Sequence, residues 1–281
     1  EEVEREPFVW LEPKERGTLL HEVFQEYIDT VKDAPGKRSP KEEKALITKI
    51  LAEAVSKYRE IVPPPGEEVL QGELRQLRRD VHVFLKINRG LGTTPVECEA
   101  VFGMEGSAPV AVPLADGASF FLRGRIDRID SAGSSEYHVW DYKTGSAYIF
   151  EERGYVVRGT QLQHCLYAVA AEQLLRQDGK DANARVTMAG YLFPTEKGTR
   201  EGKGGIIRRA QDRPSVWRAA IDRVFNLVGN GNFPVTEEGG CKFCDFEDVC
   251  GGNAARARLA LKLNDETNEG LQDWTALSQM D

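Results

Sequence analysis

Residues 124–143 decide the fold; they read GRIDRIDSAGSSEYHVWDYK. Two short runs with β-type alternation flank the turn-forming SAGSS, which predicts two neighbouring antiparallel strands. In the second run, Asp141 and Lys143 are two residues apart, so their side chains leave the strand on the same face. The hairpin is expected to bring Asp127 of the first run beside Asp141. The sequence thus predicts two carboxylates and one ammonium group at a single spot.

This combination suits the hydrolysis of phosphodiester bonds. Paired carboxylates hold a hard divalent cation through oxygen. Such a cation activates water and neutralises charge growing on the phosphate, and a neighbouring lysine orients the nucleophile or stabilises the transition state. The alternative is an ion-pair ladder on an exposed sheet face, because Asp-x-Lys alone is a short and common pattern.

The rest of the chain reads as helices first and a mixture of strands and helices afterwards. Apolar residues recur at helical spacing in three early segments, which end at breaker-rich stretches such as Pro63-Pro64-Pro65-Gly66. From Val96 onward, short β-type runs punctuated by Gly and Pro predict an antiparallel meander. The expected helices are 17–31, 41–60, 67–88, 160–175 and 215–228, and the expected strands are 96–104, 110–114, 119–129, 137–143, 184–193 and 205–209.

Bulk properties describe a soluble globular protein with one basic stretch. The chain has 281 residues, of which 41% are hydrophobic and 29% charged, and its formal net charge is −8. That acidity would usually argue against a nucleic-acid partner. Between Lys203 and Arg218, however, basic residues outnumber the single acid, Asp212. We expect Arg208, Arg209 and Arg213 to contact DNA; the alternative is a solvated charged face.

Neither a signal peptide nor a membrane-spanning apolar run is visible, so we expect a cytoplasmic protein without a membrane partner. Three of its five cysteines, Cys241, Cys244 and Cys250, lie within ten residues of one another. Such crowding is more typical of a metal site in a reducing compartment than of a disulfide framework.

The residues around the predicted hairpin resemble the RecB-like branch of the PD-(D/E)XK nucleases. In that branch a Gly-x-Ile-Asp-Arg-Ile-Asp segment precedes an Asp-Tyr-Lys-Thr-Gly segment, as residues 124–130 and 141–145 do here. The resemblance implies an α/β fold of the α+β type. Its restriction-endonuclease-like core has a central mixed sheet flanked by helices, here with an N-terminal helical insertion. It also implies Mg²⁺ or Mn²⁺ as cofactor, with Asp127 and Asp141 as ligands and Lys143 as catalytic lysine.

Two further segments resemble signatures of that branch. Residues 16–21 read RGTLLH and resemble its glycine-to-histidine helix, which implies that His21 is a metal ligand. By itself, a histidine on an amphipathic helix is more often packed or solvated. Residues 163–167 resemble a Gln-x-x-x-Tyr helix, which implies Gln163 near the lysine and Tyr167 near DNA. Both project from one helix face, although such a tyrosine also packs on sheets. Glu97 is a weaker acidic candidate.

The cysteine spacing Cys241-x2-Cys244-x5-Cys250 resembles that of RecB-like nucleases with an iron–sulfur cluster, including those of the AddB type. In those proteins a fourth, upstream cysteine completes a [4Fe-4S] cluster. Here neither Cys98 nor Cys165 precedes His21, so we expect the fourth ligand upstream of residue 1. A zinc site is the competing interpretation, because zinc also takes sulfur ligands.

We expect a nuclease domain over residues 1–251 and a C-terminal tail over 252–281. The domain would comprise a helical part at about 17–90, a catalytic core at about 96–230 and the cysteine-rich segment 241–250. A basic helix is expected at 254–263, followed by a loosely packed or mobile stretch at 264–281.

Three functions are compatible with these features. The first is the nuclease domain of an AddB-like helicase-nuclease, an exonuclease acting on mainly single-stranded DNA during repair and recombination. Its helicase would lie on another segment or polypeptide, because no phosphate-binding Gly-x4-Gly-Lys-[Ser/Thr] loop occurs. The second is a stand-alone RecB-family exonuclease or CRISPR adaptation nuclease. The third is a catalytically inactive iron–sulfur module that binds DNA.

Overall fold

The structure is a computed structural model that describes residues 6–33, 36, 38–148, 150, 154–177, 179–200, 204–235, 246–263 and 268–281. The chain divides into two units. The larger unit comprises Glu1–Val112, Phe121–Glu152 and Gln163–Asp212, and the smaller unit comprises Pro113–Phe120, Arg153–Leu162 and Arg213–Asp281. All residues of the predicted active site belong to the larger unit.

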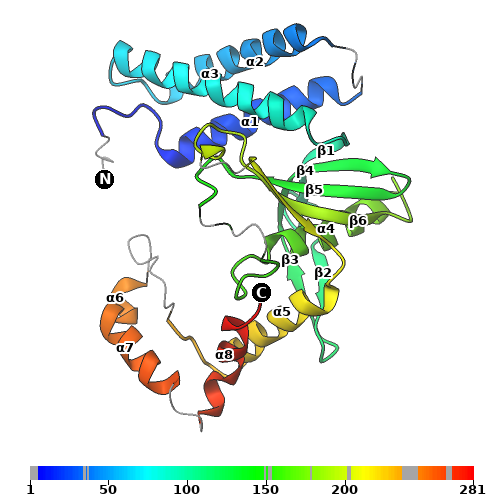
Figure 1. Ribbon diagram of the computed structural model, residues 1–281, viewed down its shortest axis with the longest axis vertical. Helices are drawn as coiled ribbons and strands as arrows, with labels where there is room; N and C mark the ends of the chain where they lie inside the picture. Colours follow the sequence, from blue (N-terminus) through cyan, green and yellow to red (C-terminus); the bar gives the residue numbers. More distant parts are fainter. Residues whose placement is uncertain are drawn as a thin grey trace. The chain divides into compact units, whose positions relative to one another are not determined.

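Three long helices open the larger unit, as the apolar periodicity predicts. They are α1 (Pro13–Val31), α2 (Pro40–Ile61) and α3 (Glu67–Arg89). Helix α2 begins at a capping box, in which Glu42 N donates to Ser39 Oγ and Ser39 N donates to Glu42 Oε2. The helices bury their apolar faces against one another, and Figure 1 shows them as one layer on one side of the sheet.

The central sheet has five strands in the order β1-β4-β5-β6-β7. Strands β5 and β6 are parallel, whereas the other neighbouring pairs are antiparallel. This is the mixed sheet that we expect, and helix α4 (Gln163–Gln177) packs on β5 and β6. The bounds of the strands are β1 (Thr94–Phe102), β4 (Gly124–Gly133), β5 (Glu136–Tyr142), β6 (Arg185–Leu192) and β7 (Ile206–Ala210).

One part of the expected meander is wrong. The residue pattern predicts a single strand over 119–129, but the segment is broken at Arg123 into β3 (Ser119–Leu122) and β4. Strand β3 pairs with β2 (Val110–Pro113) in a separate two-stranded sheet, so β1 pairs directly with β4. The β-type residue pattern continues through the break. Alternation shows that a segment is a strand but not which strand it pairs with, so the pattern does not reveal the break.

Aromatic packing ties the sheet to the helical layer. Phe24 of α1 stacks on Phe84 of α3 with ring centroids 4.2 Å apart, and Tyr142 at the end of β5 meets both rings edge-on. Aromatic pairs of this kind add about 0.5–1.5 kcal/mol each beyond the area that they bury. The end of β5, where the site lies, is therefore held against α1 and α3.

The smaller unit contains α5 (Pro214–Gly229), α6 (Glu247–Cys250), α7 (Gly252–Leu263), a short 3-10 helix (Glu269–Leu271) and α8 (Gln272–Ser278). The expectation of a loose or mobile tail is wrong for α8. Leu277 is buried with Ala220 and Leu227 of α5, and Arg223 of α5 forms a 3.0 Å ion pair with Asp273. Apolar residues at 271, 274 and 277 supply the helical spacing that packs this segment.

Within the described part of the chain, no helix combines the length and the apolar character needed to span a bilayer.

Candidate active site

The hairpin of β4 and β5 brings the two aspartates together. Arg128 pairs with Trp140 and Ile129 with Val139, so the same antiparallel register sets Asp127 across from Asp141. Asp127 Oδ2 also accepts a 2.6 Å hydrogen bond from the backbone N–H of Tyr142. Both carboxylates are mostly buried, with side chains 12% and 8% exposed.

Lys143 follows β5 directly and turns back to Asp141. Its Nζ lies 2.6 Å from Asp141 Oδ2 and donates a 3.0 Å hydrogen bond to Gln163 Oε1. Gln163, at the start of α4, donates from Nε2 to Asp141 Oδ1 at 2.8 Å. The three side chains therefore form a closed polar triangle between β5 and α4.

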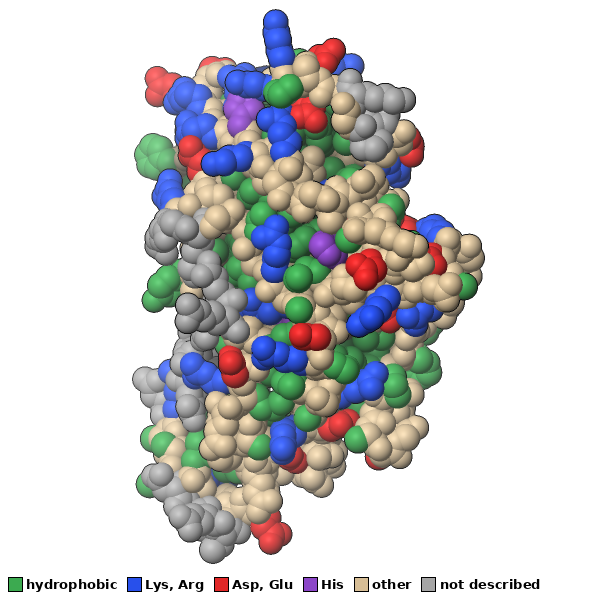
Figure 2. Space-filling view, turned by 45° about the vertical axis from the view of Figure 1, so that its right-hand side comes forward, with side chains coloured by type: hydrophobic (Ala, Val, Ile, Leu, Met, Phe, Trp, Pro, Cys, Tyr) green, Lys and Arg blue, Asp and Glu red, His purple; other side chains and the backbone are tan. Residues whose placement is uncertain are grey.

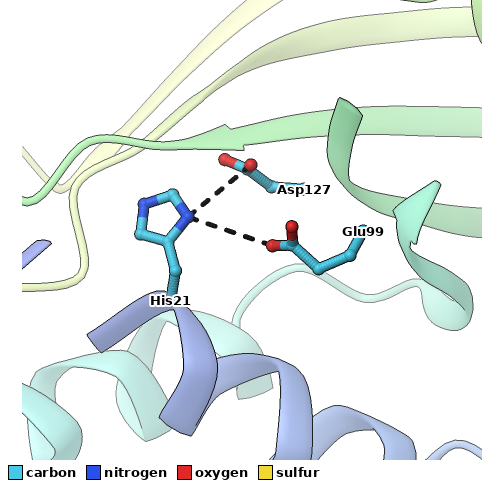
Figure 3. Close-up of side chains that lie close together, drawn as sticks. All are labelled: His21, Glu99 and Asp127. Carbon is cyan, nitrogen blue, oxygen red and sulfur yellow. Dashed lines mark ion pairs between the residues drawn. The ribbon is translucent and has the colours of Figure 1, made fainter. Parts of the chain in front are cut away.

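A second cluster joins α1 to the sheet through His21, Glu99 and Asp127. His21 Nδ1 lies 3.6 Å from Asp127 Oδ1 and 4.0 Å from Glu99 Oε1. Figure 3 shows the imidazole facing both carboxylates from α1. One ligand atom from each residue fits within 4.8 Å of the others. Nitrogen and oxygen atoms bound to one cation, each at about 2.0–2.2 Å, have separations of this order.

The sequence offers Glu97 as a weaker acidic candidate on β1, but in the structure the neighbouring Glu99 takes that place. Glu97 forms a 2.7 Å ion pair with Lys180, whereas Glu99 faces His21 and Asp127. Glu99 has φ 50°, a left-handed backbone that is uncommon for a residue other than glycine and often marks functional sites. The Glu-x-Glu pattern is visible in the sequence, but the choice between its members depends on this local backbone irregularity.

A glycine lets α1 approach the end of β5. A Cβ added at Gly17 would lie 3.3 Å from Thr144 Oγ1, which follows Lys143 in the chain. Gly17 and His21 are four residues apart, so both face the same side of α1. The close approach at Gly17 therefore carries His21, one turn later, to the acidic cluster.

The carboxylates of the site are crowded. Burial raises the pKa of Asp141 to about 6, and the neighbouring Asp127 contributes to that rise against the opposing effect of Lys143. Burial also raises the pKa of Glu99, again with a contribution from Asp127. For His21, burial lowers the pKa, but the hydrogen bond to Asp127 and the acidic charges outweigh it, so the pKa is raised overall. A divalent cation would relieve this repulsion, and the oxygen-rich donor set with one imidazole fits one.

Tyr167 lies one turn beyond Gln163 on α4 and is half-buried. Burial raises the pKa of its hydroxyl, and a hydrogen bond from Gln163 opposes that rise. Its ring meets Phe102 of β1 edge-on at 6.3 Å. The structure thus places Tyr167 next to Gln163, as the helical spacing predicts.

Two of the predicted DNA-binding arginines, Arg208 and Arg209, do not share one surface. Arg208 and Arg209 are neighbours on β7, so their side chains leave opposite faces of the sheet. Arg208 is exposed and lies over the Trp140 ring, whereas Arg209 is only 4% exposed and poorly placed to meet a phosphate. Arg213 is exposed in the smaller unit. A count of charges along the sequence does not show that neighbouring residues in a strand point to opposite faces of the sheet.

The cysteine prediction falls mostly outside the described residues. Cys241 and Cys244 belong to the undescribed part, and Cys250 ends α6 with a partly exposed side chain. Cys165 is buried beside His164, and burial raises the pKa of Cys98 on β1 to about 12. Burial of this kind disfavours the thiolate that metal ligation requires.

Comparison with known proteins agrees with this geometry. The family model of the PD-(D/E)XK nuclease superfamily matches residues 4–251. A protein of Leuconostoc citreum, named as a subunit of an ATP-dependent helicase/deoxyribonuclease, is 27% identical over 219 residues, covering 72% of this chain and 18% of that protein. Proteins of the same name from Carboxydothermus hydrogenoformans and Desulfitobacterium hafniense are 30% and 37% identical, over 60% and 35% of this chain and 16% and 8% of their own lengths.

The chain therefore spans less than a fifth of the length of these curated relatives. The family match, by contrast, covers nearly the whole chain and includes both strands that carry the acidic residues and the lysine. With its mixed sheet flanked by helices, this chain belongs to the PD-(D/E)XK nuclease superfamily, as its motifs predicted.

Proposed function

We propose that the chain is a metal-dependent deoxyribonuclease that hydrolyses phosphodiester bonds with the site formed by β4, β5, α1 and α4. One observation carries the proposal: Lys143 lies 2.6 Å from Asp141, and Asp127 on the neighbouring strand lies beside His21 of α1 and Glu99 of β1. A surface ion-pair ladder would not recruit a partly buried imidazole and a third carboxylate from other elements. An inactive DNA-binding module would not need this complete set of acidic, histidine and lysine side chains.

His21, Glu99, Asp127 and Asp141 are the residues that would hold Mg²⁺ or Mn²⁺. When bound, such a cation supplies positive charge that activates water and offsets charge developing on the phosphate. The chain contributes the geometry: Tyr142 N–H fixes one oxygen of Asp127, and Gln163 fixes one oxygen of Asp141. Ligands held in this way need little reorganisation when the substrate binds.

Lys143 is the cationic group aimed at the substrate. Its side chain is 30% exposed, so its ammonium group reaches solvent while it contacts Asp141 and Gln163. From there it can stabilise charge on the phosphate or orient an attacking water molecule. Tyr167, adjacent to Gln163, would border the substrate.

We propose single-stranded DNA as the main substrate and exonuclease activity as the mode of cleavage, within a helicase-nuclease acting in DNA repair and recombination. The relatives that carry the helicase/deoxyribonuclease name support this context. The helicase would be a separate segment or polypeptide. We propose that the protein acts in the cytoplasm.

The test is digestion of DNA labelled at either end, single-stranded or duplex, with Mg²⁺ or Mn²⁺ and with EDTA. Asp127→Ala and Lys143→Ala should each reduce the rate by at least about 10²-fold, a typical loss when a group that stabilises the transition state is removed. Lys180→Ala is the matched control, because Lys180 pairs with Glu97 outside the site. Undiminished cleavage by Asp127→Ala or Lys143→Ala would refute the mechanism, and products of uniform internal cuts would refute exonuclease action.

The metal site proposed at Cys241, Cys244 and Cys250 stays a prediction from spacing and resemblance. The visible absorption spectrum of freshly purified protein, together with its zinc content by metal analysis, distinguishes its two forms. A [4Fe-4S] cluster gives a brown protein that bleaches on reduction, whereas a zinc site gives a colourless protein with stoichiometric zinc. A colourless protein without zinc would refute both.

A further inference from the structure

A cleft opens in the larger unit next to the residues that follow Lys143. It encloses about 530 Å³, within the range of roughly 300–1,000 Å³ typical of ligand clefts. Thr144 and Gly145 form one wall, and α1, α3 and the connection between β6 and β7 form the others. The lining of the cleft therefore begins one residue beyond the catalytic lysine in the chain.

The walls of the cleft are fixed by a buried carboxylate. Asp80 of α3 is fully buried, forms an ion pair with Arg16 of α1, and accepts a 2.8 Å hydrogen bond from the backbone N–H of Glu196. Glu196 in turn pairs with Arg79 at 2.9 Å. Asp80 thus joins two helices to the β6–β7 connection, so the groups carried by that connection have defined positions.

Two cations of this connection line the cleft without an ion pair to any described carboxylate. Lys197 and Arg200 are exposed, and no acidic group of the described residues lies within ion-pair distance of either one. Arg16 adds a third positive group, although it is engaged by Glu73 and Asp80. Cations available in a cleft beside a phosphodiesterase site are suited to backbone phosphates.

The solvent face of α3 continues this positive surface. Arg75, Arg79 and Lys86 recur at spacings of four and seven, opposite the buried Leu77 and Phe84 stripe. The acidic residues after Glu68 on this helix are Glu73 and Asp80, and both bind Arg16. Between Arg75 and Lys86 the helix rises about 17 Å, enough for several nucleotides of a strand.

Figure 2 shows Lys and Arg side chains gathered over the helical layer, at the upper end of the view. From Arg75 to Arg89, α3 carries five basic residues and one acidic residue, Asp80, whereas the chain as a whole has a net charge of −8. Among the described residues, Arg75 and Lys86 have no carboxylate within ion-pair distance. A face that served only for solubility would need no such segregation of charge.

We infer that this cleft and the basic face of α3 form a track for the phosphate backbone of one DNA strand, extending from the active site past Thr144 and Gly145. The inference rests on the proposed nuclease function and adds the path of the substrate. Lys197 and Arg200 hold the strand beside the site, and Arg75, Arg79 and Lys86 hold the more distant part. A single strand suits the track, because the carboxylates at its active-site end are mostly buried.

The test compares Lys197→Gln/Arg200→Gln and Arg75→Gln/Lys86→Gln with wild type on two single-stranded substrates. One has about five nucleotides and fits the active site alone, whereas the other has about thirty and reaches the track. Each double variant should raise KM for the long strand roughly tenfold and leave kcat within about twofold. The salt slope of log Kd should fall by about 1.4, since a single strand contributes about 0.7 per phosphate contact. For the short strand, Arg75→Gln/Lys86→Gln should behave as wild type.

Lys49→Gln/Lys57→Gln is the charge-matched control. Lys49 pairs with Glu53 on α2, and Lys57 lies beside Glu22, Glu26 and Asp29 of α1, away from the track. Wild-type KM for the long strand in the track variants would overturn the track while leaving the nuclease intact. Equal losses of kcat on both strands would also overturn it, because they indicate a disturbed active site. A wild-type chain that neither binds nor cuts DNA would refute the proposed function itself.

Discussion

Gln163 donates a 2.8 Å hydrogen bond to Asp141 while it accepts a 3.0 Å hydrogen bond from Lys143. One amide of α4 therefore sets the positions of two charged groups at the end of β5. An amide is suited to this place because it offers a donor and an acceptor without adding charge. A glutamate would repel Asp141, and a lysine would repel Lys143.

Gln163→Leu should reduce kcat about 10–100-fold, as is usual when a partner that orients a metal ligand is lost. The melting temperature should change little, because the residue is half-buried. Gln173→Leu is a control on the same helix, since Gln173 bonds the carbonyl of Ala111 instead. Steady-state cleavage assays together with thermal melts separate the two effects. A kcat equal to that of wild type would show that Gln163 does not position the site.

Glu99→Gln and Glu97→Gln form a matched pair on one strand. The first removes a carboxylate beside His21 and Asp127, whereas the second disrupts an outer ion pair with Lys180. We expect Glu99→Gln to weaken Mn²⁺ binding by at least about tenfold, because ligand charge governs affinity at hard-cation sites. Glu97→Gln should bind as wild type. Isothermal titration calorimetry provides the measurement, and equal affinities for the two variants would exclude Glu99 from the site.

The raised pKa of Asp141 gives a pH dependence with a definite sign. Burial and Asp127 raise it from 3.8 to about 6, so the folded metal-free chain binds more protons than the unfolded chain between these values. Its free energy of unfolding should therefore fall as pH rises from about 4 to about 6. The raised pKa of Glu99 acts in the same direction. Asp141→Asn should flatten this decline.

Cation binding should reverse the trend, because it requires ionised carboxylates. Mn²⁺ should raise the melting temperature of the wild type more at neutral pH than at about pH 5, where Asp141 holds its proton. Thermal melts with Mn²⁺ and with EDTA across this range test both statements. A stabilisation by Mn²⁺ that is independent of pH would contradict them.

Asp127 and Asp130 belong to one sequence motif but should behave oppositely. Asp130 is fully buried on the helical side of the sheet, 2.5 Å from Arg128, which also donates to Asn88 of α3. Asp130→Ala leaves a buried cation without its carboxylate and should reduce the free energy of unfolding by about 3–5 kcal/mol. Asp127→Ala should abolish cleavage without such a loss. Urea denaturation measures the difference, and an Asp130→Ala chain as stable as wild type would contradict this assignment.

The sequence by itself determined the local elements and most of the site. Apolar periodicity marked α1, α2 and α3 to within a few residues, because a helix with one buried face must repeat its apolar residues. Two stretches with β-type alternation on either side of a turn predicted the β4–β5 hairpin. These features depend on residues close together in the chain, and so do the spacings that place Asp141 with Lys143 and Gln163 with Tyr167.

The tertiary structure decided the features that depend on how segments far apart in the chain pair and pack. The break at Arg123, the choice of Glu99 over Glu97 and the burial of Arg209 all follow from strand register and sheet faces. The sequence singled out Asp127 for the site, but only the fold shows that Asp130 is buried with Arg128 on the face that meets α3. The cleft beside Thr144 likewise forms where α1, α3 and the β6–β7 connection meet. Local propensity acts over a few residues, whereas these features arise from contacts between segments far apart in the chain, as between Asp80 and Glu196 in the cleft.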